Sequence, residues 1–479
     1  MGLIGLHRVM MWGICMLVFI AFAEISMASS HKDKVSKEPD SATEKVVVQQ
    51  IKISGNKTTK ERIIIKELAF GIGDTIDAAR LDAMAEESKN NLLNTSLFNF
   101  VYINFVLNPN RTVVFDITVE ERWYLWAFPL FEQSDRNVSS FIKNGNWDMM
   151  NYGMYIRRDN FRGRQETVKF RLLTGYSTQF SLSFQSPEYK GKVGWGVLFL
   201  YNMFDHVAVS TINDKPVYLK TPGNTLYSTN QNQLYLQYRH NLYSRHQVAV
   251  SYQQNSISDS VRIINQNFLG SNSRRNSFVE LSYMFTHDTR DSKVYPLKGL
   301  LQSITLTKYG LGSKSEVDYA NAVGRLNFYQ PIGSRFDFGT EFTGVWGTNG
   351  EVPYFNRLGF GYKDNIAGYE YHVADGPTYA LLKNRFLYEL VPTKVKHWDF
   401  IPLSKFSKIH YTIYLRAFYE SGYVWNQKGD ISNQLLNKYL YGYGAGIDLV
   451  TFYDKAFSCY YAFNSIGQGG LFFNLLFKM

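Results

Sequence analysis

The chain has few of the residues on which soluble enzymes and disulfide-stabilised secreted domains depend. Only two cysteines occur among 479 residues, Cys15 and Cys459, so neither a disulfide framework nor a cysteine-based metal site can be read from their spacing. Charged residues make up 19% of the chain, against about 25% in typical globular domains. The nine histidines have no zinc-type spacing, and no phosphate-binding loop, dinucleotide fingerprint or Gly-x-Ser-x-Gly motif occurs. We therefore expect neither an enzyme nor a metal or cofactor.

Long apolar runs are missing as well, except at the N-terminus. Residues 1–28 combine an apolar stretch with Ser-Met-Ala at positions 26–28, which predicts a secretory signal peptide and its small-residue cleavage site. Residues 29–45 are polar and charged, which predicts a flexible linker. Since no other segment is long and apolar enough for a spanning helix, the mature chain would have to enter a membrane through β-strands.

Aromatic residues are abundant where charged ones are scarce. They make up 16% of the chain, with 34 Tyr and 35 Phe, while the mean hydropathy is only −0.24. A membrane β-barrel has this composition, because every second residue faces the lumen and tyrosine suits the membrane interface. The net charge of +10 fits either a solvated basic surface or attraction to anionic lipid headgroups. No basic run is interleaved with aromatic residues, so we expect no nucleic-acid partner.

The first part of the mature chain mixes strand and helix patterns. A period-two pattern predicts a strand over residues 46–53, and amphipathic patterns predict helices over 59–68 and 77–93. Two further alternating segments predict strands over 100–106 and 112–120. The order β-α-α-β-β indicates a small α+β domain.

Three short motifs in this region occur in a specific order. They are Ile51-Lys52-Ile53-Ser54-Gly55-Asn56, Gly73-Asp74 and Thr95-Ser96-Leu97-Phe98. Together they resemble a POTRA domain, the periplasmic module that precedes certain outer-membrane barrels. The resemblance covers residues 46–121 and implies an edge strand that can pair with an incoming polypeptide.

The remainder of the chain, residues 122–479, is a succession of strand patterns. Phe180 and Leu182, for example, alternate with Ser181 and Ser183, as expected where one face meets lipid and the other a polar lumen. We predict that the α+β domain is followed by an all-β, antiparallel transmembrane β-barrel of about sixteen strands.

The connections between the predicted strands differ at the two ends of the barrel. One end has mostly short turns, as expected for the periplasmic side. The other end has three long loops, over residues 205–229, 258–273 and 347–378. One connection on the short-turn side, residues 392–408, is long and basic, and the sequence offers no explanation for it.

A predicted periplasmic turn resembles a motif of the BamA/TamA family of outer-membrane assembly barrels. It reads Asp-Thr-Arg-Asp, with Asp288, Arg290 and Asp291, and is followed by a Pro-x-x-Gly segment that ends at Gly299. Acidic and basic side chains in such a turn can close it by ion pairs and by hydrogen bonds to its backbone.

The long segment 347–378 resembles the family's outer loop that folds back into the lumen. Its tip in the family reads Val/Ile-Arg-Gly-Phe/Tyr, and here it reads Ile-Ala-Gly-Tyr, with Ala367, Gly368 and Tyr369. The acidic residue that pairs with the family's arginine corresponds to Glu420. Because alanine replaces that arginine, we expect another cation of the inner wall to neutralise Glu420.

Two arginines are candidates for this cation. Arg416 shares a strand face with Glu420, and Arg385 lies on the neighbouring strand, where cross-strand partners sit closer. Two alternatives stay open. Water in the lumen can solvate Glu420, or the loop can be held by Tyr369 and Tyr371 alone.

The first and last predicted strands would meet at a seam that closes the barrel. Pro129 in the first strand and Gly469 and Gly470 at the start of the last would weaken their pairing, unless the glycines only ease the bend of the wall. The end of the last strand resembles the C-terminal signal read by the barrel-assembly machinery, with alternate apolar residues Phe473, Leu475 and Phe477.

The resemblance implies a bacterial outer-membrane protein, with its POTRA domain in the periplasm, that assists insertion or translocation of polypeptides through a laterally gated barrel. The implied partners are outer-membrane lipids, unfolded outer-membrane or secreted polypeptides, and periplasmic or lipoprotein accessory subunits. One alternative is a transporter pore of the two-partner-secretion or lipid-export type. Another, which Ala367 favours, is a structural surface-antigen barrel without assembly activity.

Overall fold

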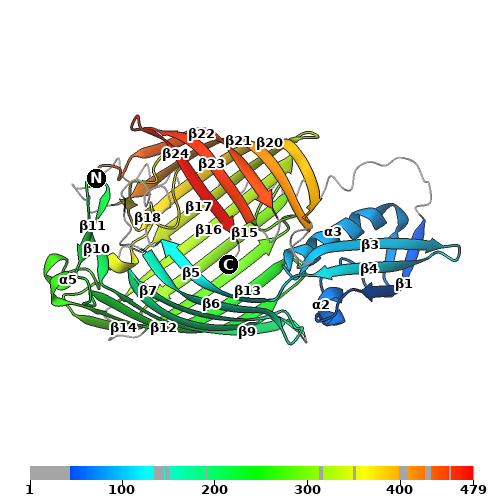
Figure 1. Ribbon diagram of the computed structural model, residues 1–479, viewed down its shortest axis with the longest axis horizontal. Helices are drawn as coiled ribbons and strands as arrows, with labels where there is room; N and C mark the ends of the chain where they lie inside the picture. Colours follow the sequence, from blue (N-terminus) through cyan, green and yellow to red (C-terminus); the bar gives the residue numbers. More distant parts are fainter. Residues whose placement is uncertain are drawn as a thin grey trace, which may run out of the picture.

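A small mixed domain and a large antiparallel barrel make up the protein, with the small domain at one end of the barrel (Figure 1). The computed structural model describes residues 44–133, 145, 150–189, 191–311, 317–348, 352–398, 408–426, 433–451 and 455–477. The predicted signal peptide, with Cys15, and nearly all of the predicted linker lie outside these residues.

The front domain is a four-stranded sheet packed against helices. Its elements are β1 (Lys45–Ser54), α2 (Glu61–Ile65), β2 (Thr75–Asp77), η1 (Ala78–Arg80), α3 (Leu81–Asn94), β3 (Phe98–Asn108) and β4 (Thr112–Glu121). The sheet order is β2-β1-β4-β3, and β1 runs parallel to β4. The core includes a stack of Phe70 on Phe115, with 3.8 Å between ring centroids.

The predicted β-α-α-β-β order is present, with two differences. The short edge strand β2 was not predicted. The first helix is shorter than the predicted 59–68, because the amides of Glu67 and Leu68 donate to carbonyls three residues back rather than four.

The barrel wall is a single sheet of sixteen strands, which confirms the predicted class and strand number. The strands are β5 (Leu125–Gln133), β6 (Met150–Phe161), β7 (Glu166–Gly175), β8 (Ser177–Ser186), β9 (Val193–Phe204), β12 (Tyr227–Arg239), β13 (Ser244–Ile257), β14 (Arg275–Asp288), β15 (Gly299–Tyr309), β16 (Tyr319–Pro331), β17 (Phe336–Gly347), β20 (Thr378–His397), β21 (Lys408–Trp425), β22 (Tyr439–Thr451), β23 (Lys455–Asn464) and β24 (Gly469–Phe477). Side chains such as Phe180 and Leu182 stay exposed on the outside, at 42% and 40% of their surface.

The front domain contacts the short turns of the barrel and so identifies the periplasmic end. Arg239, at the end of β12, binds Glu67 of the front domain through two hydrogen bonds of 2.8 and 2.7 Å. Lys66 Nζ donates to the carbonyl of Glu188 at 2.9 Å. Both partners in the barrel lie beside the short turns that follow β8 and β12, as expected for a periplasmic domain.

The opposite end of the barrel carries additional structure that the sequence did not predict (Figure 1). The loops there contain a hairpin of β10 (His206–Ile212) and β11 (Lys215–Lys220), helix α5 (Asp259–Ile264), the 3-10 turn η3 (Tyr354–Asn356), and a two-stranded pair of β18 (Gly359–Phe360) and β19 (Ala374–Asp375). The prediction of strands alone over residues 122–479 is therefore wrong at helix α5. Helix α5 forms because the hydroxyl of Ser258 accepts a bond from the Val261 amide at 3.4 Å and caps it.

The basic connection over residues 392–408 is largely strand rather than loop, where it is described. β20 continues to His397 and β21 already begins at Lys408, so the two strands extend as a paired ribbon past the end of β17. Register shifts between Glu389 and Val391, and between Val391 and Lys394, let the ribbon leave the curve of the wall.

None of the helices in the described ranges is long and apolar enough to cross a membrane.

Candidate functional site: the folded-back loop and the barrel seam

The seam of the barrel lies between β5 and β24, the two ends of the sheet order (Figure 1). β5 pairs with β6 and β24 pairs with β23, and within the described strands no backbone ladder joins β5 to β24. Pro129 lies opposite Met154 in the β5–β6 register. Proline has no amide hydrogen to donate, so it is tolerated at the edge of a sheet and weakens further pairing there.

The last strand begins with the two predicted glycines. Gly469 pairs with Phe463, and Gly470 pairs with Ala462. Phe473 is 49% exposed on the outer face. Leu475 and Phe477 continue the ladder with β23, but their side chains lie outside the described part of the chain.

The long outer loop between β17 and β20 packs into the lumen, as predicted. Phe360 meets Tyr379 edge-on, with 5.3 Å between ring centroids, and Tyr379 Oη donates to Asp364 Oδ2 at 2.6 Å. Ile366 is fully buried in the same apolar cluster as Val424 of β21. The body of the loop is therefore held by the inner wall of β20 and β21.

The tip of the loop is held by Glu420 without an arginine. The Ala367 amide donates to Glu420 Oε2 at 2.8 Å, and Lys383 Nζ lies 3.3 Å from the same oxygen. Lys383 and Glu420 are direct register partners on β20 and β21. The expected cation is therefore present, but the prediction of Arg416 or Arg385 in this position is wrong.

The tip also reaches the last hairpin of the barrel. Asn464 Nδ2 donates to the Gly368 carbonyl at 2.6 Å, and the hydroxyls of Tyr369 and Ser465 lie 2.6 Å apart. A Cβ at Gly442 would collide with the Ala367 carbonyl, so the wall is glycine where the tip approaches closest. The alternative that Tyr369 and Tyr371 alone hold the loop is therefore incomplete.

Behind the tip, the loop touches the seam strand itself. Tyr371 packs against Phe472 of β24, with 5.6 Å between ring centroids, and Phe472 is only 2% exposed. Glu370 accepts a hydrogen bond from Tyr460 Oη at 2.8 Å. His372 Nε2 lies 2.9 Å from Gln468 Oε1, just before β24 begins. The loop thus contacts one of the two strands that form the seam.

The predicted turn motif closes as expected from its charges. Arg290 binds Asp288 through Nε and Nη2, at 2.8 and 2.9 Å. Asp291 Oδ1 accepts the amides of Ser292, Leu297 and Lys298 at 2.8, 3.1 and 3.2 Å. Gly299 has a φ of 107°, and a Cβ there would collide with the Thr289 carbonyl.

This turn also contacts the front domain. Asn94 Nδ2, at the end of α3, donates to the carbonyls of Arg290 and Asp291 at 3.2 and 3.0 Å. Asn94 Oδ1 accepts the Lys293 amide at 3.2 Å. One amide side chain therefore satisfies three backbone groups of the turn.

Arg385 and Arg416 belong to the surroundings of this turn rather than to the loop tip. Arg385 lies over Tyr295 and Tyr329, with 5.1 and 5.0 Å to the ring centroids, and donates to the Pro296 carbonyl at 2.6 Å. Arg416 lies 3.5 Å from Asp448, which accepts a hydrogen bond from Tyr295 Oη at 2.8 Å.

Three contributors to the site were missed in the sequence. Lys383 shares a strand face with Arg385 by alternation, but its pairing with Glu420 depends on a register that the sequence does not specify. Asn464 sits in an ordinary hairpin turn and gave no signal. The hairpin of β10 and β11, whose Asp214 carbonyl accepts the Val373 amide at 2.8 Å, could have been found from its Asn-Asp turn between alternating segments.

No group of three or more His, Cys, Asp or Glu residues that could hold a metal occurs in the described ranges. The site therefore consists of hydrogen bonds, ion pairs and aromatic contacts between a loop and a wall.

A profile described as the Omp85 superfamily domain matches residues 160–451, more than half of the chain. The chain belongs to the Omp85 superfamily. A second profile, POTRA, described as the surface antigen variable number repeat, matches residues 46–122. The resemblance read from the motifs is thus confirmed, together with an outer-membrane barrel and a periplasmic POTRA domain. Members of this family are transport or assembly barrels and not enzymes.

The chain is similar to several solved structures at low sequence identity. CdiB from Escherichia coli is 12% identical, with a TM-score of 0.56, over 91% of this chain and 76% of that chain. BamA from Haemophilus ducreyi lacking POTRA domains 1–3 is 13% identical, with a TM-score of 0.49, over 90% and 83%. CdiB from Acinetobacter baumannii is 13% identical, with a TM-score of 0.48, over 90% and 74%. No curated protein matches the sequence.

Proposed function

We propose that this Omp85 protein assists the insertion or translocation of polypeptides at the outer membrane, with the POTRA domain receiving them and the seam between β5 and β24 opening laterally. The observation that carries the proposal is that, among the strands that the structure describes, each seam strand has a backbone ladder on one edge only. An edge strand offers unpaired amides and carbonyls to another strand. In the hydrocarbon of a membrane no water can satisfy those groups, so pairing with another strand lowers their free energy.

The POTRA domain offers an edge of the same kind. β3 is the last strand of its sheet and pairs only with β4 among the described strands. Tyr102 and Val106 on β3 are 48% and 64% exposed, so an incoming strand would find both backbone groups and apolar side chains there. Expected partners are therefore extended polypeptides. We also propose that the substrates are outer-membrane or secreted polypeptides and that periplasmic or lipoprotein subunits assist the protein.

A continuous series of contacts connects the POTRA domain to the seam. It runs from α3 through the periplasmic turn and across the lumen to β24, by way of Asn94, Asp291, Ser292, Tyr295, Asp448, Arg416, Tyr460 and Phe472. We infer that a shift of the POTRA domain on binding a polypeptide is passed to the seam through these contacts, with the loop holding β24 until then.

A disulfide across the seam tests the lateral opening. Cysteines at Leu125, Ala127 or Phe131 of β5 are combined with cysteines at Leu471 or Phe473 of β24, in a Cys459→Ser background. A pair at matching height should lock the seam and block growth complementation while the heat-modifiable barrel persists. The control is Ile447→Cys with the native Cys459, since these register partners join two strands that are already paired. Full complementation by a locked seam would contradict lateral opening.

Depletion identifies the substrate. Loss of many barrel proteins from the outer membrane is the result expected for assembly activity. Loss of one secreted polypeptide would instead indicate an exporter of the two-partner-secretion type, and altered surface lipid would indicate lipid export. An unchanged outer membrane would indicate a structural barrel.

A further inference from the structure

The outer face of the barrel carries a polar surface at one end of β12, β13 and β14. β12 and β13 are joined by a short turn beside the POTRA domain, where Arg239 binds Glu67, and the turn after β14 also contacts that domain through Asn94. The other ends of the three strands are therefore extracellular. Near the periplasm the outward side chains are apolar, as at Leu234 and Leu236, which are 51% and 56% exposed. Towards the outside, the outward positions of the same strand become Asn232, Asn230 and Ser228 by strict alternation.

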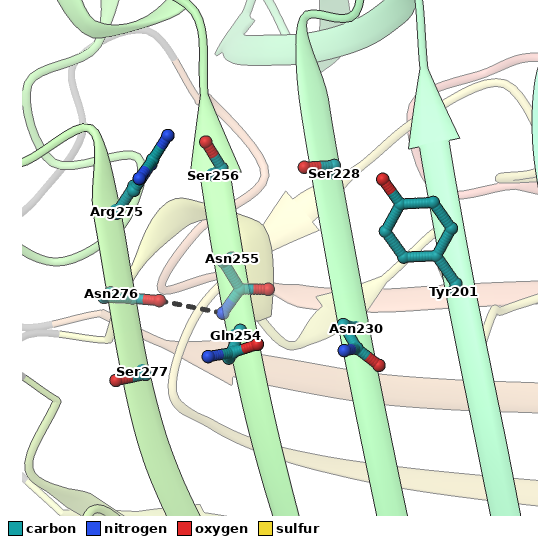
Figure 2. Close-up of a pocket in the computed structure, with 9 residues that line it drawn as sticks. All are labelled: Tyr201, Ser228, Asn230, Gln254, Asn255, Ser256, Arg275, Asn276 and Ser277. Carbon is teal, nitrogen blue, oxygen red and sulfur yellow. Dashed lines mark hydrogen bonds between the residues drawn. The ribbon is translucent and has the colours of Figure 1, made fainter.

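This polar surface is hollowed. A depression of about 640 Å³ lies across four neighbouring strands, lined by Tyr201, Ser228, Asn230, Gln254, Asn255, Ser256, Arg275, Asn276 and Ser277 (Figure 2). The small serines make the floor low, and Tyr201 and Arg275 stand at opposite sides of it. Asn255 and Asn276 are buried beneath and hydrogen-bonded to each other at 2.9 Å, which fixes the two strands behind the floor.

The depression lies at the level of lipid headgroups. Tyr252 is an outward aromatic residue, 41% exposed, of the kind that marks the membrane interface. Gln254, the next outward residue, lines the depression and donates to Tyr252 Oη at 3.0 Å. Two residues of strand span about 6.6 Å, so the depression begins one step above Tyr252 on the extracellular side. Acyl chains could not satisfy its amides and hydroxyls, and leaving them unsatisfied in hydrocarbon is costly.

The chemistry of the lining indicates one class of ligand. Hydroxyl and amide groups offer many donors and acceptors, as a sugar requires, and no acidic side chain is among the nine lining residues. Arg275 is exposed and forms no ion pair in the described structure, whereas the adjacent Arg274 lies 3.2 Å from Asp259. An unpaired arginine beside polar groups suits a phosphate.

We propose that this depression binds the phosphorylated saccharide headgroup of an outer-leaflet glycolipid, with Arg275 on the phosphate and the serine, asparagine and glutamine side chains on the sugar. Tyr201 covers the apolar face of the sugar ring. The site is independent of the seam, and it fixes how the barrel sits among the lipids of the outer leaflet. It rests on the membrane location of the family and not on the proposed role with polypeptides.

Native mass spectrometry of the full chain tests the site with bisphosphorylated lipid A, monophosphorylated lipid A and phosphatidylglycerol as probes. Wild-type protein should prefer the bisphosphorylated lipid. Arg275→Gln should lower the affinity for it about tenfold, the expected cost of losing a charge-assisted hydrogen bond. Arg275→Lys should keep most of it. The matched control, Arg274→Gln, should leave the affinity unchanged because Arg274 is engaged by Asp259.

A second variant tests the hollow itself without changing charge. Ser256→Leu should fill the floor, lower the affinity for both forms of lipid A and leave phosphatidylglycerol binding unchanged. Ser228→Leu replaces it if the Ser256 variant fails to give the heat-modifiable folded band. Equal losses in Arg274→Gln and Arg275→Gln, displacement of the lipid by excess inorganic phosphate, or undiminished binding in the filled variant would each overturn the proposal.

Discussion

Glu67 of the POTRA domain and Arg239 of β12 form a buried, two-pronged ion pair between the two domains, with 2.8 and 2.7 Å between oxygens and nitrogens. Their side chains are 7% and 9% exposed. Because neither charge can return to water while the domains are docked, the pair fixes the POTRA domain in one orientation under the barrel.

Removing one charge of this pair should loosen the docked POTRA domain. Glu67→Gln leaves Arg239 buried without its hydrogen-bonded counter-charge, which costs about 3 kcal/mol or more in a buried pair. Hydrogen exchange in α2 and in the turn after β12 should rise, while the barrel keeps its heat-modifiable band. The double variant Glu67→Gln with Arg239→Gln should recover part of the loss. Unchanged exchange in the single variant would contradict a locked orientation.

The same pair predicts a dependence of docking on pH. Burial alone would raise the pKa of Glu67, but the hydrogen bonds and charge of Arg239 outweigh it and hold the pKa below its ordinary value of 4.5. The stabilisation is therefore complete above pH 4.5 and is lost as the pH falls through the lowered pKa. Spin-label distances between the domains should stay constant from neutral pH down to about 5 and broaden only below this range.

The loop tip should respond to Lys383 in place of the family's arginine. Lys383→Met removes the cation from Glu420 and should destabilise the folded loop by about 1 kcal/mol, since the side chain of Lys383 is 30% exposed and partly screened. Protease sensitivity of the loop in intact cells measures this. Arg385→Gln is the matched control, because its contacts are with the periplasmic turn.

Reintroducing the family arginine offers a sharper form of the same prediction. Ala367 is 4% exposed and already touches the wall, so Ala367→Arg alone should be poorly tolerated. Combined with Lys383→Ser, the new guanidinium can take the place of the ammonium, and folding should recover. Equal behaviour of the single and the double variant would show that the two cations do not share one position.

The contrast between the strands and the ion pair of Lys383 with Glu420 shows what the sequence can and cannot predict. Alternation of residues such as Phe180 and Ser181 specifies the two faces of a strand, and it was sufficient for all sixteen strands of the wall. It also puts Lys383 and Arg385, two residues apart, on one face of their strand. It does not specify the register between strands, which here makes Lys383 and not Arg385 the direct partner of Glu420.

The structure of the outer loops was not predicted from the sequence, for a related reason. The β10–β11 hairpin and helix α5 are stabilised by contacts with one another and with the folded-back loop, as where Asn265 Nδ2 donates to the Val209 carbonyl at 2.7 Å. Contacts between loops far apart in the chain leave no periodic pattern in either. The turn motif was predictable because Asp288 and Arg290 are only two residues apart in the sequence and bind each other directly.

The turn motif should contribute mainly through Asp291. Asp291→Ala leaves three turn amides without their acceptor, which should destabilise the barrel by about 2–3 kcal/mol. Asp291→Asn keeps the oxygen that accepts all three bonds, so it should stay close to wild type. Midpoints of heat-modifiable migration compare the two. A loss as large in the asparagine variant would indicate that the negative charge, and not the geometry of the acceptor, stabilises the turn.

Cys459 offers a test of the two faces of the wall without an engineered label. It is exposed on β23, opposite Phe473 of the seam strand, and shares its face with the exposed Phe457 and Tyr461. A thiol that faces acyl chains is out of reach of a water-soluble, charged reagent. In outer membranes Cys459 should therefore react with a lipid-soluble maleimide and resist a charged one. Brominated lipids should quench the fluorescence of the attached lipid-soluble label.

In the Cys459→Ser background, Phe180→Cys should behave like the native thiol, and Ser181→Cys should show the reverse preference. If the charged reagent labels Cys459 and Ser181→Cys equally, the assignment of lipid and lumen faces is wrong.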